Sequence, residues 1–181
     1  QHIGTALAQI VAEELELDWA QVSIDYPEMD TIQFAKTGMQ MTGGSRSVLQ
    51  SFEPLSRSAA VAREFLIEAG ADILGSEASS CYAKEGYIID DGYGERISYG
   101  QILSQTVIEH EIQPEELAEI ELKAKDQYKI IGQSVNALDI NEKVNGKARY
   151  GILLSVKFQS QSPLSFLGMQ RLSWNKHDLY A

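Results

Sequence analysis

The sequence contains one cysteine, Cys81, and three histidines that lie far apart. A single thiol excludes an intramolecular disulfide and a cysteine-based metal cluster, and no His, Asp or Glu spacing resembles a zinc or iron site. There is no apolar run of about 18 residues, which excludes a membrane-spanning helix in this sequence. We therefore predict no metal ligands, and we identify no catalytic residue, because no general base can be assigned to Cys81.

Basic residues are also scarce. Lys and Arg number 15 against 26 Asp and Glu, so the formal net charge is −11. This balance argues against non-specific nucleic-acid binding, which depends on a basic surface. The hydrophobic fraction of 44% and the charged fraction of 23% are ordinary for a globular protein with one domain, or one domain and a small part of another.

Apolar spacing predicts two main helices. The first covers Thr5–Leu17, where apolar residues such as Leu7 share one face. The second follows a longer stripe from Val48 to Ile73, and Gly75 is suited to its C-terminal cap. Pro54 lies inside this stripe, so we expect it to kink or restart the helix.

Shorter patterns predict strands, one hairpin and two further helices. The hairpin pairs residues 80–83 with 87–90, and a strand at 96–99 leads into a helix at 99–109 with Ser98 as N-cap. Further strands are expected at residues 21–26, 128–132 and 148–154, with a loop or an irregular strand at 29–41. A short helix is expected at 139–144 with Asp139 as N-cap, and a linker or a weak edge segment at 109–125. The predicted fold class is α+β, with a mixed β-sheet packed by two main helices and a small hairpin subdomain.

The segment Gln40–Ser47 is the one place where local chemistry suggests a ligand class. Gly43 and Gly44 allow close approach of the backbone, while Ser45 and Ser47 place hydroxyls at the start of a helix, where the dipole favours an anion. This pattern predicts a phosphate-bearing ligand. The alternative from residue chemistry alone is a loop and helix cap without a ligand, because a glycine-rich turn before a helix is common.

Several segments resemble a known family, in the family's order. The first is Gln1–Leu15, followed by Asp18-Trp19, and the segment Gln40–Val48 comes next. Three later segments also fit, namely Cys81–Ala83, Ile97–Gly100 and Ile131–Ser134, followed by Leu138–Gly151. Together, over about residues 1–152, they resemble the large subunits of molybdenum hydroxylases, which include xanthine dehydrogenase and aldehyde oxidase. Within that family, the branch of the isoquinoline 1-oxidoreductase beta-subunits is the most similar.

The resemblance implies a place beside a molybdopterin cofactor, in its cytosine dinucleotide form. Gln1 matches the glutamine that approaches the molybdenum ligands, and Gly43, Gly44, Ser45 and Ser47 match the loop that holds the phosphate end. The implied function is the cofactor-binding portion of an oxidoreductase subunit that hydroxylates aldehydes or N-heterocycles. A small [2Fe-2S] subunit is the implied partner, and the implied bacterial location is either periplasmic or cytoplasmic.

The sequence departs from the family in three respects. His2 stands where the family has glycine, the family's catalytic glutamate is not matched, and residues 153–181 do not follow the family. We therefore expect residues 1–127 to form part of the cofactor-binding domain, 128–154 to begin the following domain, and 155–181 to be a divergent tail. The expected chain is incomplete and inactive alone, and holds the cofactor only in the parent protein. The alternatives are a truncated non-catalytic remnant that folds as a homo-oligomer, or a module that binds another phosphate ligand.

Overall fold

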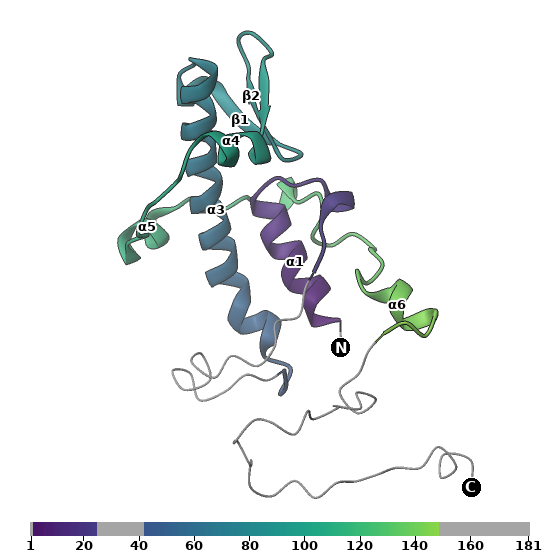
Figure 1. Cartoon of the computed structure of the whole chain (residues 1–181). Coiled ribbons are helices and arrows are strands. Elements are labelled where there is room, and N and C mark those ends of the chain that lie inside the picture. The colour runs from purple at the N-terminus through teal and green to yellow at the C-terminus, as the bar shows by residue number, and fades with distance from the viewer. Residues whose placement is uncertain (1, 25–41, 149–181) are drawn as a thin grey trace, which may run out of the picture. The chain divides into compact units, whose positions relative to one another are not determined.

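The structure is a computed structural model that describes residues 2–24 and 42–148. The chain divides into two compact units, residues 1–146 and 147–181. The first unit combines helices with a three-stranded antiparallel sheet, which confirms the predicted α+β class (Figure 1). The predicted domain boundaries after residues 127 and 154 remain predictions.

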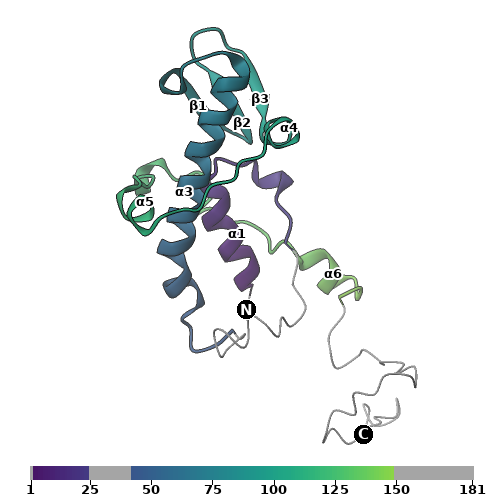
Figure 2. The ribbon, with the colours of Figure 1, turned by 60° about the vertical axis from the view of Figure 1, so that its left-hand side comes forward.

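Helices α1 (Ile3–Glu14) and α3 (Ser47–Leu74) confirm the two predicted main helices. They lie side by side, and the sheet lies against the C-terminal part of α3 (Figures 1 and 2). Small buried residues, Ala59 and Ala60, let α3 pack closely against its neighbours. Small buried side chains on α3 thus allow its close packing.

Helix α3 is 28 residues long in all and continues through Pro54, so Pro54 does not restart the helix. Pro54 is exposed, and its missing N–H removes one hydrogen bond from the ladder without leaving a buried group unpaired. The helix ends at Gly75, which has a φ of 72° and donates its N–H to the carbonyls of Ala71 and Asp72. The predicted glycine cap is confirmed.

The sheet contains β1 (Cys81–Lys84), β2 (Tyr87–Asp90) and β3 (Arg96–Ser98), in that order and antiparallel throughout. Lys84 pairs with Tyr87 across a two-residue turn. Glu85 and Gly86 in this turn have φ values of 51° and 79°, as a type I′ hairpin turn requires. The predicted hairpin is confirmed.

The hydrophobic core joins α3, the sheet and α4 (Tyr99–Gln105). Its buried members are Leu66, Ile88, Ile97 and Ile102. The hydroxyl of Ser98 accepts the N–H of Gln101 at 3.2 Å, which confirms the predicted N-cap of α4. Helix α4 ends at Gln105, short of the predicted Glu109.

Two of the predicted strands do not form in the described residues. Residues 19–21 make a 3₁₀ helix (Trp19–Gln21), because the carboxylate of Asp18 accepts the N–H of Ala20 at 3.0 Å. Residues 22–24 have no regular structure, and residues 25–26 lie outside the described part. Residues 128–132 also form no strand, because the N–H groups of Lys129, Ile130 and Ile131 donate to the carboxylate of Glu13. The loop or irregular strand expected at 29–41 and the strand expected at 148–154 lie outside the described residues, save for residue 148.

The predicted linker at 109–125 contains a helix, α5 (Pro114–Glu119), with Pro114 in its first turn. Arg57 of α3 donates to the carbonyls of Leu117 and Ala118 at 2.7 and 3.1 Å, which attaches the end of α5 to α3. The predicted short helix near residue 140 is confirmed as α6 (Ile140–Val144). Two further 3₁₀ helices complete the described elements, Ala78–Ser80 and Lys125–Gln127.

We predict that Gly70→Ala destabilises the fold. A Cβ at Gly70 would lie 2.8 Å from Cγ1 of Ile88, which is completely buried in the core. Overpacking of this kind lowers the free energy of unfolding by about 1–3 kcal/mol. Urea unfolding measures the change.

The matched control is Gly100→Ala in α4, where a Cβ meets nothing within 4 Å. Its free energy of unfolding should be unchanged or higher, because alanine favours helix over glycine. Equal stability of Gly70→Ala and the unmodified chain would contradict the packing of α3 on β2.

Candidate functional site

The predicted phosphate turn is the direct entry to α3. Gly44 and Ser45 have φ values of 63° and 55°, so two consecutive residues adopt the left-handed conformation. Glycine adopts it freely, whereas serine does so at a cost in free energy. Arg46 then occupies the N-cap position and Ser47 begins the helix. The structure thus brings Gly43, Gly44, Ser45 and Ser47 together in one turn.

This turn presents donors at the surface. The first hydrogen bond within α3 joins the N–H of Gln50 to the carbonyl of Arg46 at 2.8 Å, so the preceding N–H groups have no acceptor inside the helix. A Cβ at Gly44 would meet nothing within 4 Å, and Ser45 and Arg46 are exposed. A phosphate can therefore approach the backbone at Gly44. It would meet helix N–H groups, two hydroxyls and one guanidinium, all of which suit a phosphate.

The other end of the predicted cofactor site lies at the start of α1. Gln1 is outside the described residues. His2, which stands where the family has glycine, has a φ of 56° and is exposed. The tight turn expected from that glycine is therefore present, although a side chain occupies it.

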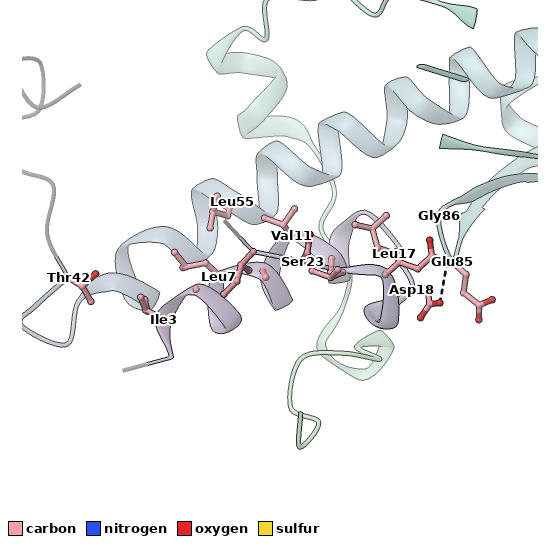
Figure 3. Close-up of a pocket in the computed structure, with 16 residues that line it drawn as sticks. Ile3, Leu7, Val11, Leu17, Asp18, Ser23, Thr42, Leu55, Glu85 and Gly86 are labelled. Atoms are coloured by element: carbon pink, nitrogen blue, oxygen red, sulfur yellow. Dashed lines mark hydrogen bonds between the residues drawn. The ribbon is translucent and has the colours of Figure 1, made fainter. Parts of the chain in front are cut away.

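An apolar groove of about 1050 Å³ runs along α1. Leu7 and Val11 from α1 and Leu55 from α3 project into it (Figure 3). Thr42 lies at one end of the groove, and Asp18 lies at the other, beside the β1–β2 turn (Figure 3). Because Thr42 directly precedes Gly43, the groove ends at the predicted phosphate turn. Sequence periodicity placed apolar residues of this helix on one face but did not reveal that, among the described residues, this face borders a groove.

A buried carboxylate lies on another face of α1. Glu13 is 1% exposed, and its Oε1 accepts a hydrogen bond from Nζ of Lys123 at 2.7 Å. Its two carboxylate oxygens also accept the N–H groups of Lys129, Ile130 and Ile131, at 2.6 to 3.1 Å. Burial alone would raise the pKa of Glu13, but these donors outweigh it and hold the pKa below its ordinary value.

The two neighbouring carboxylates differ from each other. Glu14 is also buried, and burial raises its pKa even though Arg63 lies 3.3 Å away. Glu16 pairs with Nζ of Lys123 and Nζ of Lys129 at 2.7 and 2.9 Å. Burial opposes ionisation of Glu16 too, but the two ammonium groups lower its pKa.

The three carboxylates are thus bound to protein donors, which leaves them suited to structural roles and not to acid–base chemistry. The cluster itself was missed from the sequence. The spacing of Thr5, Gln9 and Glu13, four residues apart on one helix face, is the signal that could have indicated it.

Within residues 2–24 and 42–148, no group of His, Cys, Asp and Glu side chains is arranged to hold a metal ion. Cys81 is half-buried in β1, and burial raises the pKa of its thiol, so it is not an activated nucleophile. Among the helices described, none has the length and apolar character needed to cross a membrane.

We predict that the groove binds an apolar fluorescent dye such as anilinonaphthalene sulfonate, because its lining is apolar and open. Leu55→Gln should weaken binding by about tenfold or more, since burying a leucine side chain contributes roughly 1.5–3 kcal/mol. A fluorescence titration measures the dissociation constant. Leu103→Gln, on an exposed leucine of α4, is the control and should bind as the unmodified chain does. Identical titrations for both variants would show that the dye binds elsewhere.

Comparison with known proteins identifies the family. Residues 1–156 match the molybdopterin cofactor-binding domain family. The chain is 40% identical over 153 residues to a membrane-bound aldehyde dehydrogenase [pyrroloquinoline-quinone] of Gluconacetobacter polyoxogenes, and the match covers 84% of this chain and 19% of that protein.

Two further relatives are named as enzyme subunits. One is a nicotinate dehydrogenase subunit of Pseudomonas putida, 30% identical over 148 residues, where the match covers 82% of this chain and 12% of the relative. The other is the beta-subunit of isoquinoline 1-oxidoreductase from Brevundimonas diminuta, 25% identical over 187 residues, with 86% and 24% covered. The chain therefore spans less than a quarter of the length of each relative.

The matched region includes both α1 and the turn that begins α3, and it also covers the later segments on which the sequence resemblance rests. The resemblance to molybdenum hydroxylase large subunits is confirmed, and the chain belongs to the molybdopterin cofactor-binding domain family found in oxidoreductases.

Proposed function

We propose that Gly43, Gly44, Ser45 and Ser47 hold the phosphate end of a molybdopterin cofactor in its cytosine dinucleotide form. The observation that carries the proposal is the turn itself. It lies inside the matched family region, it is open above Gly44, and it precedes the N-terminus of a 28-residue helix. Backbone N–H groups and hydroxyls at such a position favour a diphosphate.

The individual roles follow from the chemistry of each residue. The first N–H groups of α3 and the hydroxyls of Ser45 and Ser47 donate to phosphate oxygens. Gly44 leaves the backbone accessible, and Arg46 adds a positive charge beside the same oxygens. Gln1 is proposed to donate its side-chain amide to the metal end of the cofactor, as the family resemblance implies.

The proposed role of this chain is to hold the cofactor. When bound, the cofactor supplies hydroxylation of a substrate with water as the oxygen source. Glu13 and Glu16 are paired with lysines, and Glu14 with Arg63, so we assign no catalytic residue to the described part of the chain. We further propose that the whole protein acts on aldehydes or N-heterocycles, since the names of the relatives cover both classes.

A partner follows from the same relatives. Two of them are named as subunits, so their enzymes contain more than one chain. We propose a small [2Fe-2S] subunit as the partner, which would receive the electrons released by hydroxylation. Co-purification with an iron–sulfur chain from the native organism would support it.

The phosphate turn is tested by calorimetric titration with cytidine diphosphate. We expect the double variant Ser45→Ala/Ser47→Ala to weaken binding by about 10- to 100-fold, because hydrogen bonds to a charged group contribute roughly 1.5–3 kcal/mol. Ser104→Ala, on the exposed face of α4, is the matched control and should bind normally. The absence of cytidine diphosphate binding to the unmodified chain would overturn the assignment of the turn.

Cofactor identity is tested separately, after expression in a host that makes molybdopterin. Mass spectrometry and metal analysis of the purified protein should detect the pterin and molybdenum. Binding of pyrroloquinoline quinone in place of the pterin would overturn the proposal. Binding of cytidine diphosphate without any pterin would favour a module for another phosphate ligand.

A further inference from the structure

A polar stripe on α1 binds the backbone of a distant part of the chain. Nε2 of Gln9 donates to the carbonyl of Ile130 at 3.2 Å, and the hydroxyl of Thr5 accepts the N–H of Leu138 at 3.0 Å. On the same stripe lies Glu13, whose carboxylate accepts three consecutive N–H groups from residues 129–131. Side chains of α1 thus form hydrogen bonds with the backbone of residues 123–138, as a neighbouring strand would in a sheet.

This segment stands apart from the hydrophobic core. None of residues 120–146 is fully buried, and the core cluster is formed by Leu66, Ile88, Ile97 and Ile102. The partly buried side chains packed against that cluster all lie between residues 15 and 108. Regions with few buried apolar contacts open at lower free energy than the core. Within the described part of the chain, hydrogen bonds to α1 restrain residues 123–138 where packing in the core does not.

We propose that protonation of the Glu13 side chain in acid releases residues 123–138 from α1. Helices α1 and α3 and the three-stranded sheet stay folded when this happens. A protonated carboxyl group has one oxygen that carries hydrogen and accepts poorly. It can no longer satisfy three N–H groups and the ammonium of Lys123 together. Unpaired donors left in a buried place are costly, which favours their release to water.

The groups that face Glu13 come from three elements. Lys123 and Lys129 lie on the released segment, and Tyr128 is beside them. Glu14 and Glu16 belong to α1 and its C-terminal turn, and Arg63 belongs to α3. The ammonium of Lys123 pairs with the carboxylates of both Glu13 and Glu16. Protonation of Glu13 therefore leaves Lys123 with one carboxylate partner in place of two.

The direction of the pH dependence follows from these contacts. The pKa of Glu13 is held below its ordinary value, so its stabilising effect is present above that ordinary value and is lost as the pH falls through the lowered one. Glu16 acts in the same direction. The pKa of Glu14 is raised, so Glu14 is the first of the three to take up a proton, and this removes a negative charge beside Glu13 without removing its donors.

Hydrogen exchange measured by mass spectrometry on the whole chain tests this release, with exchange rates corrected for the intrinsic effect of pH. On acidification, amides of residues 129–131 should lose protection by about tenfold or more, while α3 and β2 keep theirs. Loss of protection in all three regions at one pH would overturn the proposal, because the segment would then belong to the cooperative core. This comparison needs no variant.

Glu13→Gln supplies an independent test at neutral pH. The amide keeps the volume of the side chain but replaces one acceptor oxygen with a donor that faces Lys123. Residues 129–131 should then exchange at neutral pH as the unmodified chain does in acid. Glu68→Gln, on an exposed face of α3, is the control and should leave exchange unchanged. Equal protection in Glu13→Gln and the unmodified chain at neutral pH would overturn the proposal.

Discussion

The buried carboxylate of Glu13 is the interaction on which the placement of residues 123–138 depends. An isolated buried charge would be strongly unfavourable, and Glu13 is tolerated because one ammonium and three backbone N–H groups surround it. The same contact satisfies N–H groups that would otherwise require a strand partner. One side chain therefore replaces a stretch of sheet, and this explains why residues 128–132, which have the pattern of a strand, do not form one.

Helix α1 takes part in three separate features of the structure. It packs against α3, its Leu7 and Val11 line the groove, and its Thr5, Gln9 and Glu13 bind the distant segment. A helix with a single apolar stripe and a solvated opposite face would have needed only one of these contacts.

The proposed site is formed by short segments, and the larger elements only position them. The turn from Gly43 to Ser47 owes its anion preference to backbone donors, which depend on conformation and less on side-chain identity. The groove beside it combines residues of α1, α3 and the β1–β2 turn, which lie far apart in the sequence (Figure 3). The family match covers all of these elements.

The sequence by itself determined the features that depend on near neighbours. Helical spacing predicted α1 and α3, and single residues marked the cap at Gly75, the hairpin turn at Gly86 and the N-cap at Ser98. The Gly-Gly-Ser turn was also predictable, because its chemistry lies within five residues. The tertiary structure alone decided that residues 129–131 bind Glu13, that α5 is attached to Arg57, and that α1, α3 and the β1–β2 turn together line a groove. Those outcomes depend on partners distant in the sequence, whose positions local spacing does not encode.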